Sequence, residues 1–504
     1  MNRSPTQPNG INLRLALGLA LVGAAGVLLL LWTTPRGVGL YYDSMPYLES
    51  AENALAGQGF GRVTCEAFKP MTRYPPFYSV LLAGLIAMGI EPYAGARLLS
   101  AAALGVASVL LGATLWRTTR SWTVSVLGGV ILLISTPVLG VFTWAMSEPA
   151  YLALWLSSLL LADMYLVSGQ RHLLVASGIA AALAFLTRYV GALPIAAIAL
   201  FLTAGAIRRR NAWSDVGWFL AIACMPVALW IGRGLLVAGN PTSRELEARL
   251  PDRAALREGV ETVVGWYGRS VGTWSEEQLL AAFAALVLAF LVLWMSLARR
   301  RSPAPPGTYL VPLHIASTAA YCIGVMVSIL LFDPMTPLDD RILIPVYLSM
   351  VIVLLTLLHR AIAHRSIPVA VLGLVIVVAL VSNQLGRFGG TAARLRADGQ
   401  GYAGARWRNS QVAEWIRQQR PAVIYTNDIT AVYFGGGGPS CAIPALGADA
   451  AMASMRERLQ KDGGIVAIFG SVTGEFAPMS ELTEGLTLIE EVDDGQIYEA
   501  VTDW

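Results

Sequence analysis

The chain has 504 residues, of which 55% are hydrophobic and 14% are charged. A soluble globular protein carries roughly 25% charged residues, so this composition excludes that class and indicates an integral membrane protein. The formal net charge of +3 is too small to indicate a nucleic-acid partner.

The first predicted element is an apolar helix from Leu15 to Trp32, which is long enough to cross a bilayer and has no small-residue cleavage site after it. We therefore expect a retained span rather than a signal peptide. The stretch "FLTRYVG" interrupts residues 173–207, and a single span there would move every later segment to the other side. If residues 173–207 form two spans, the sequence has ten further predicted spans after the first. They lie near 93–116, 122–141, 149–167, 173–187, 190–207, 215–237, 278–298, 309–331, 342–358 and 367–383.

Basic residues gather in alternate short connections between these eleven spans, as they do in cytoplasmic loops. This bias predicts a multi-pass protein of the plasma (inner) membrane with a cytoplasmic N-terminus. The large polar segments 34–76, 238–277 and 384–504 would then all lie outside. The basic positions are Arg117, Arg120, Arg171, 208–210, 299–301, Arg360 and Arg365.

The first outer segment (34–76) holds an acidic, aromatic stretch, "GVGLYYDSMPYLESAENALAGQGF", with three carboxylates and no basic residue. Ser44 or Asp43 could cap a short helix there, with Pro46 in its first turn and Gly57 as its stop. Asp43 could instead act as a general base at the bilayer surface. The next stretch, "PPFYSVLLAGLIAMG" (75–89), is short for a crossing and is predicted to be an interfacial or re-entrant helix.

The polar C-terminal segment has the pattern of a small α/β domain. "SQVAEWIRQQ" and "AAMASMRERLQKDGG" have helical spacing, "AVIYTN" (422–427) and "GIVAIFG" (464–470) are typical of strands, and "LTLIEEVDDGQIYEAV" predicts a hairpin around Asp494-Gly495. Residues 1–383 are thus predicted to form the membrane region and 384–504 an extracytoplasmic domain. Cys65 and Cys441 would share one side of the membrane, so a disulfide between them could form.

An ordered set of motifs resembles a known class of membrane enzyme. "DSMPYLESAENALAGQGF" with "TRYPPFYSVLLAGL", then "SEPAYLALWL", "LAFLTRYVGALP" and "LDDRILIPVYL", and finally a "W…AVIYTND…VYF" pattern cover nearly the whole chain. Together they resemble the GT-C glycosyltransferases, with most likeness to family 39, which includes protein O-mannosyltransferases and the aminoarabinose transferase acting on lipid A. Protein O-mannosyltransferases have two adjacent acids in the first loop. Here Ser44 follows Asp43, which weakens the case for a protein acceptor.

The resemblance implies a GT-C-like helical fold of about eleven transmembrane helices. It also implies transfer, with inversion, of a sugar from a polyprenyl-phosphate-linked donor to a hydroxyl of a lipid, glycan or protein acceptor. The acceptor hydroxyl must lose a proton, which Asp43 would take. The leaving lipid phosphate gains negative charge, which guanidinium groups would stabilise. The arginines predicted for that role are Arg73, Arg188 and Arg341.

Each of these residues also has a structural interpretation. Arg73 could be an interfacial anchor, and Arg341 could extend its side chain to the interface or pair with Asp339 or Asp340. Arg188, where two spans meet, is costly unless it is paired. Glu148 could cap a helix, act in catalysis or bind a divalent metal ion. Tyr42, Tyr74 and Asp340 complete the predicted contacts to sugar or acceptor, and Asp428 is a further candidate in the outer domain.

Three other functions remain open at this stage. A transporter or flippase of lipid-linked sugars would explain the intramembrane Arg188 and Arg233, although no internal repeat of the spans is visible. An oligosaccharide polymerase or ligase of the same membrane class would join whole glycans. A non-catalytic assembly factor on this scaffold would need neither Asp43 nor the arginines.

Overall fold

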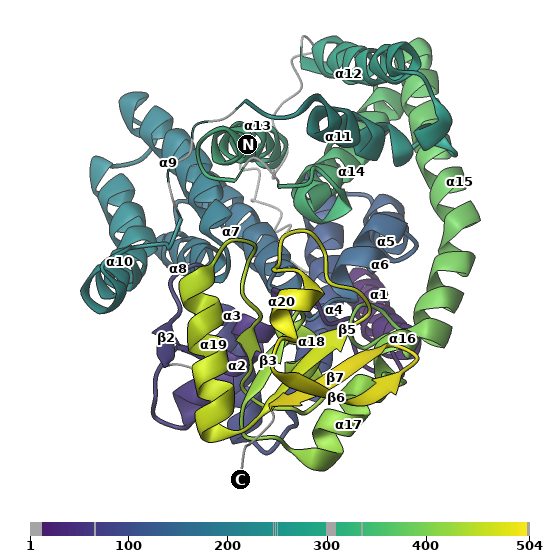
Figure 1. Cartoon of the computed structure of the whole chain (residues 1–504). Coiled ribbons are helices and arrows are strands. Elements are labelled where there is room, and N and C mark those ends of the chain that lie inside the picture. Colours follow the sequence, from purple (N-terminus) through teal and green to yellow (C-terminus); the bar gives the residue numbers. More distant parts are fainter. Residues whose placement is uncertain are drawn as a thin grey trace, which may run out of the picture.

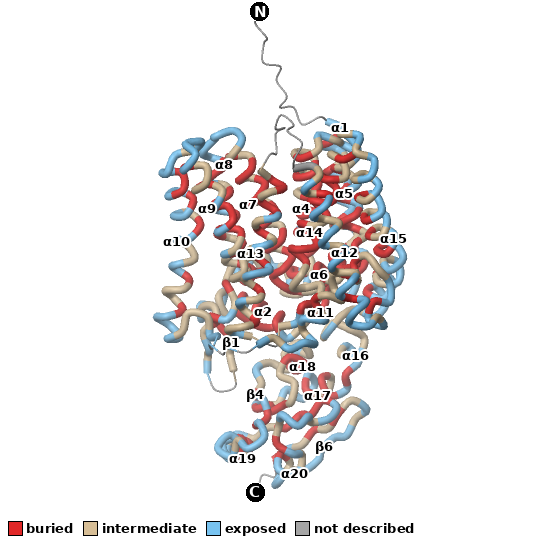
Figure 2. Tube along the Cα trace, turned by 90° about the horizontal axis from the view of Figure 1, so that it is seen from above, coloured by how far each residue is buried: buried red, intermediate tan, exposed pale blue. Residues whose placement is uncertain are grey.

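The computed structural model describes residues 13–64, 67–244, 246, 248, 250–298, 309–333 and 336–500. A bundle of long helices forms most of the molecule, and a small α/β domain lies at one end of it (Figure 1 and Figure 2). Over the described ranges, nine helices are long and apolar enough to cross a membrane. They are α1 (Leu13–Thr33), α4 (Pro92–Thr119), α7 (Glu148–Ser168), α9 (Ala192–Ile207) with the preceding 3-10 turn η1 (Tyr189–Gly191), α10 (Trp213–Ala238), α12 (Glu276–Ala298), α13 (Leu310–Leu331), α14 (Asp340–Ala363) and α15 (Ile367–Asp398).

The remaining predicted spans are also helical. Helices α5 (Trp122–Leu133) and α6 (Thr136–Phe142) meet at a 63° bend, and Pro137 lies in the first turn of α6. Helix α8 (Arg171–Thr187) has 17 residues and packs against α7 and α10. Arg188 adopts an extended conformation between α8 and η1, which confirms that two helices occupy 173–207. All eleven predicted stretches are therefore helical.

Close helix packing in the bundle depends on small residues. A side chain on Gly105 of α4 would meet the carbonyl oxygen of Gly23 of α1 at 2.9 Å, so only glycine lets these two helices approach so closely. The largest buried apolar cluster then continues through α4, α7 and α14, with Leu104, Leu156 and Leu348 almost fully buried.

Short elements gather at one end of the bundle. They are α2 (Ser44–Leu55), the antiparallel pair β1 (Gly61–Val63) and β2 (Phe68–Pro70), α3 (Phe77–Ala87), α11 (Arg253–Gly265) and η2 (Val271–Thr273). Helix α2 has Pro46 in its first turn, and Gly57 follows it with φ +79°. Helix α3 has 11 residues, too few to cross a bilayer.

The α/β domain begins later than predicted, because α15 continues without a break past residue 383 to Asp398. The predicted helices, strands and hairpin are present, and the five strands have the order β4-β3-β5-β7-β6. The elements are α16 (Ala405–Arg408), α17 (Gln411–Gln419), β3 (Ile424–Thr426), α18 (Ile429–Phe434), β4 (Cys441–Ala442), α19 (Asp449–Asp462), β5 (Ile465–Phe469), α20 (Met479–Leu482), β6 (Leu486–Val492) and β7 (Gly495–Ala500). Cys441 is disulfide-bonded; Cys65, its suggested partner, lies outside the described residues.

The α/β domain rests on the first outer segment. Tyr402 donates its backbone N–H to the carbonyl of Leu40 at 2.8 Å, and the Tyr433 hydroxyl donates to Glu52 of α2 at 2.9 Å. The rings of Tyr93 and Phe434 also meet, with centroids 5.9 Å apart. Figure 2 shows this domain and α2 at the end of the bundle opposite the start of α1.

Candidate functional site

A cavity of about 340 Å³ opens where the first outer segment meets α13 and α14. Four guanidinium groups and two carboxylates line it, together with the tyrosines of the acidic stretch and of η1. The charged residues of its wall are Asp43, Arg73, Arg188, Arg244, Asp333 and Arg341. These residues come from five separate parts of the sequence, so the fold assembles the site.

Asp43 points into this cavity and does not act as a helix cap. It occupies the position before α2, but its side chain makes no capping hydrogen bond. Its Oδ2 instead pairs with Arg341 Nη2 at 2.9 Å, and its Oδ1 accepts a short hydrogen bond from the Tyr74 hydroxyl. The capping interpretation of Asp43 is therefore wrong, and its carboxylate is available to the cavity.

Two tyrosines flank this carboxylate. Burial and the Asp43 charge raise the pKa of Tyr74 above its usual range, so its hydroxyl stays protonated and donates to Asp43. Tyr42 also lines the cavity, and its hydrogen bond with Tyr41, followed by burial, raises its pKa to about 12. Both tyrosines thus present neutral hydroxyls to whatever binds there.

Glu148 lies behind the cavity wall rather than on it. It is the first residue of α7, it is almost fully buried, and it is not among the residues that line the cavity. Its Oε1 accepts from Arg188 Nη1 at 2.6 Å and from Arg341 Nε at 2.5 Å, whereas Oε2 has no hydrogen-bond partner in the described structure. Glu148 therefore fixes the positions of two arginines and does not cap the helix.

Arg188 and Arg341 thus meet on one carboxylate oxygen, that of Glu148. Arg188 stands at the break between α8 and η1, and Arg341 in the first turn of α14. Because Arg341 also binds Asp43, it links the carboxylate in the cavity to the buried one. A buried carboxylate shared by two guanidinium groups holds both of them rigidly.

Arg73 and Arg244 are the cations of the cavity that have no ion-paired or hydrogen-bonded partner among the described residues. The hydroxyls of Thr72 and Ser243, the preceding residues, hydrogen-bond to each other and hold the two segments together. Burial and the neighbouring Arg73 lower the pKa of Arg244. Arg244 was not predicted from the sequence, because the stretch "NPTSREL" around it contains no recognisable motif.

Three candidate residues have other roles in the structure. Asp340 accepts from the indole of Trp266 at 2.8 Å, outside the cavity, so its predicted contact with sugar or acceptor is not supported. Arg233 donates to backbone carbonyls of the first outer segment. Asp428 caps α18 and accepts from the Tyr402 hydroxyl.

A separate, apolar cavity of about 720 Å³ adjoins the polar one. Helices α11, α12, α13 and α14 form its walls, and no charged residue is among those that line it in the described structure. Tyr321 and Val325 of α13 line both cavities. The arrangement suits an amphiphile with an anionic head beside the arginines and a hydrocarbon tail among the helices. As for metal ligands, the described residues contain no group of three or more His, Cys, Asp or Glu side chains that could hold an ion.

No protein-family model matches this sequence, and no curated protein matches it. The structure is similar to that of ArnT from Cupriavidus metallidurans bound to undecaprenyl phosphate, with TM-score 0.60, 12% identity, and coverage of 95% of this chain and 97% of that one. It is also similar to the arabinofuranosyltransferase AftD from Mycobacteria, with TM-score 0.54 and 16% identity over 96% of this chain but 40% of AftD.

A third similar structure is the archaeal oligosaccharyltransferase AglB from Archaeoglobus fulgidus, in complex with an inhibitory peptide and a dolichol-phosphate. Its TM-score is 0.50 at 12% identity, over 90% of this chain and 69% of that one. Identities this low show a shared fold and carry no residue-level comparison. The chain is a polytopic helical membrane protein with the fold of the GT-C membrane glycosyltransferases.

Proposed function

We propose that this chain is a glycosyltransferase that moves a sugar from a polyprenyl-phosphate-linked donor to an acceptor hydroxyl at the outer face of the membrane. The observation that carries the proposal is one cavity that combines the Asp43 carboxylate with four arginines and adjoins an apolar cavity between helices. The lipid phosphates bound to ArnT and AglB support this class of carrier.

In the proposed reaction, Asp43 is the general base. Its carboxylate takes the proton of the acceptor hydroxyl while that oxygen attacks the anomeric carbon from the face opposite the phosphate. The bond between the anomeric carbon and the phosphate oxygen breaks, and the polyprenyl phosphate leaves with the electron pair. The anomeric configuration is therefore inverted.

The four arginines have two different tasks in this scheme. No carboxylate of the described residues forms an ion pair with Arg73 or Arg244, so these two arginines are best placed to stabilise the charge that develops on the leaving phosphate. Arg188 and Arg341 keep unused N–H donors for the same phosphate while Glu148 fixes their orientation. Glu148 is in this view a positioning residue rather than a catalytic one.

The hydrocarbon chain of the donor would lie in the apolar cavity between α11 and α14. Tyr321 and Val325, which line both cavities, mark the path from the head group to the chain. On the other side, the α/β domain covers the first outer segment, where it would limit access of water and help to select a lipid, glycan or protein acceptor.

A direct assay tests the proposed function. The purified protein is incubated with a panel of synthetic undecaprenyl-phosphate monosaccharides and an extract of cell-envelope lipids and glycans, and the release of undecaprenyl phosphate is followed by mass spectrometry. Release that depends on both the donor and the extract supports the proposal. Binding of every donor without release from any of them, combined with movement of the intact donor across vesicles, would establish a transporter instead.

A further inference from the structure

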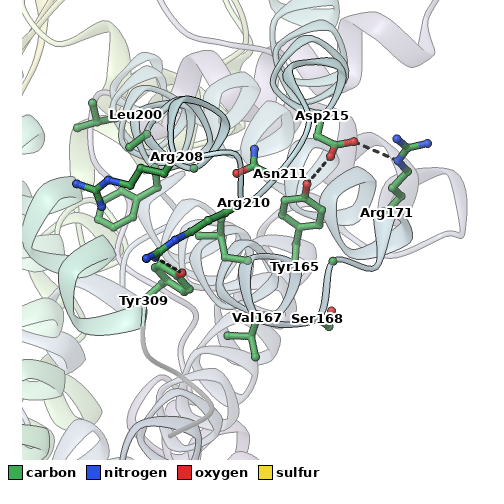
Figure 3. Close-up of a pocket in the computed structure, with 15 residues that line it drawn as sticks. Tyr165, Val167, Ser168, Arg171, Leu200, Arg208, Arg210, Asn211, Asp215 and Tyr309 are labelled. Carbon is green, nitrogen blue, oxygen red and sulfur yellow. Dashed lines mark hydrogen bonds and ion pairs between the residues drawn. The ribbon is translucent and has the colours of Figure 1, made fainter. Parts of the chain in front are cut away.

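A second polar cavity, of about 660 Å³, lies at the opposite end of the bundle. It is enclosed by the end of α7, the start of α8, the turn between α9 and α10, and the start of α13 (Figure 3). Since a helix rises 1.5 Å per residue, Tyr165 in this cavity lies about 25 Å along α7 from Glu148. The two cavities therefore face different sides of the membrane, and this one has no part in the proposed transfer reaction.

The turn between α9 and α10 is folded tightly against the cavity. A side chain on Gly205 would strike the amide oxygen of Asn211, so the observed position of the Asn211 amide depends on glycine here. The Asn211 amide donates to the carbonyl of Leu202 at 3.0 Å, and Arg209 adopts a left-handed conformation with φ +54°. As a result, Arg208 and Arg210 line the cavity, whereas Arg209 between them does not.

The charges of this cavity do not balance. Asp215 is the acidic residue in its lining, and it already pairs with Arg171 at 3.1 Å and accepts from the Tyr165 hydroxyl at 2.7 Å. Among the described residues, the Arg210 side chain contacts only a neutral hydroxyl, that of Tyr309, at 3.4 Å, and the Arg208 side chain has no partner. Figure 3 shows the Asp215 contacts on one side of the cavity and the Arg210–Tyr309 contact on the other. Within the described part of the chain, two guanidinium groups thus remain without a counter-ion.

The apolar part of the cavity wall indicates that the missing counter-ion belongs to an amphiphilic molecule. Apolar side chains, including Val167, Leu200 and Phe201, line it together with the arginines. Leu200 is 62% exposed on the outside of the bundle, and Trp213, at the start of α10, is 60% exposed. Tryptophans in such positions mark the interface between head groups and hydrocarbon. The cavity therefore opens at the depth of lipid phosphates, with apolar surface below it for acyl chains.

We propose that this cavity is a binding site for one anionic glycerophospholipid, with its phosphate held by Arg208 and Arg210. Basic pockets between membrane helices at the cytoplasmic side suit such head groups. Guanidinium groups can donate two parallel hydrogen bonds to a phosphate, and the Tyr309 hydroxyl, already in contact with Arg210, is a third donor within the same lining. The lipid would bridge α7, α9, α10 and α13, and so join helices whose opposite ends surround Arg188 and Tyr321.

The test is native mass spectrometry of the full-length protein in detergent, titrated with dioleoyl phosphatidylglycerol and, separately, with dioleoyl phosphatidylcholine. The variant is Arg208→Gln with Arg210→Gln. The matched control is Arg120→Gln with Arg209→Gln, which removes the same charge at the same end of the bundle but outside the cavity. We expect the unmodified protein to retain one phosphatidylglycerol molecule. Its binding affinity should fall about tenfold or more in the variant and should not change in the control.

Other outcomes overturn the proposal. Equal loss in the control would mean that only general positive charge attracts the lipid, and equal retention of phosphatidylcholine would mean that the head-group charge is not recognised. Competition by millimolar inorganic phosphate that removes the lipid would identify a site for free anions. Should the double variant not fold, Tyr309→Phe keeps the test decisive: it should weaken phosphatidylglycerol binding several-fold, and unchanged binding would contradict the site.

Discussion

The carboxylate of Asp43 and the guanidinium of Arg341 lie 2.9 Å apart, although 298 residues separate them in the sequence. One belongs to the first outer segment and the other to the start of α14. Because Arg341 also binds Glu148, this ion pair joins the proposed general base to the cationic side of the cavity.

Replacing Arg73 or Arg244 by glutamine should weaken binding of undecaprenyl phosphate about tenfold or more, because each change removes a charge-assisted hydrogen bond from an arginine that has no ion pair among the described residues. Microscale thermophoresis of the purified protein with undecaprenyl phosphate measures the effect. Arg253→Gln is the control, since Arg253 is exposed at the same end of the bundle and does not line the cavity. Unchanged affinity in the Arg73–Arg244 double variant would remove both residues from the phosphate site.

Replacing Glu148 by glutamine should lower stability by about 3 kcal/mol, because two partly buried guanidinium groups lose their shared carboxylate. Thermal unfolding in detergent reports this loss. Transfer should fall as well, whereas undecaprenyl phosphate should still bind, since a repulsive negative charge has been removed. Glu261→Gln is the control: Glu261 pairs with Arg257 near the surface, where a salt bridge contributes less than about 1 kcal/mol. Equal stability of the two variants would argue against the positioning role.

Filling the apolar cavity should discriminate between carriers by chain length. Ala319→Trp places a large side chain in the cavity between α11 and α14. Undecaprenyl phosphate should then bind more weakly, whereas citronellyl phosphate, whose chain is short, should bind as before. Ala221→Trp puts the same side chain on the exposed face of α10 and should change neither affinity. Parallel loss of both ligands would place the hydrocarbon chain elsewhere.

Weakening the contacts that hold the α/β domain on the bundle should reduce use of the acceptor rather than binding of the donor. Tyr433→Phe with Phe434→Ala removes the hydrogen bond to Glu52 and the ring contact with Tyr93. All residues that line the polar cavity lie outside this domain, so donor binding should remain. Transfer to the acceptor should fall several-fold, chiefly through a higher KM for the acceptor. A loss of undecaprenyl phosphate binding in the folded variant would show that the domain helps to form the donor site.

Much of the fold was predictable because membrane helices have a strong local signal. Apolar length located all eleven helical stretches, including the break at Arg188, where a charge interrupts the apolar run. The short helix α3 was recognisable from its length and its two preceding prolines. The end of the membrane region was less predictable, since α15 continues as a polar helix to Asp398 and hydropathy cannot detect that extension.

The site was only partly predictable, because side-chain direction depends on tertiary contacts. Asp43 and Asp340 both follow plausible motifs, yet Asp43 turns into the cavity while Asp340 turns toward Trp266. Asp339, one residue earlier, is the one that caps α14. Arg244 has no local pattern at all. It reaches the cavity because the hydroxyls of Thr72 and Ser243 join two distant segments.

Asp43→Asn tests whether Asp43 is the general base of the transfer reaction. Asparagine keeps the size of the side chain, and with its single oxygen turned toward Arg341 its NH2 group can donate to the Tyr74 hydroxyl, so the variant should fold and should bind undecaprenyl phosphate. Asp340→Asn, outside the cavity, is the matched control. Transfer from the undecaprenyl-phosphate sugar should fall about a hundredfold or more in Asp43→Asn and remain near normal in Asp340→Asn. Near-normal transfer by a well-folded Asp43→Asn protein would contradict the account.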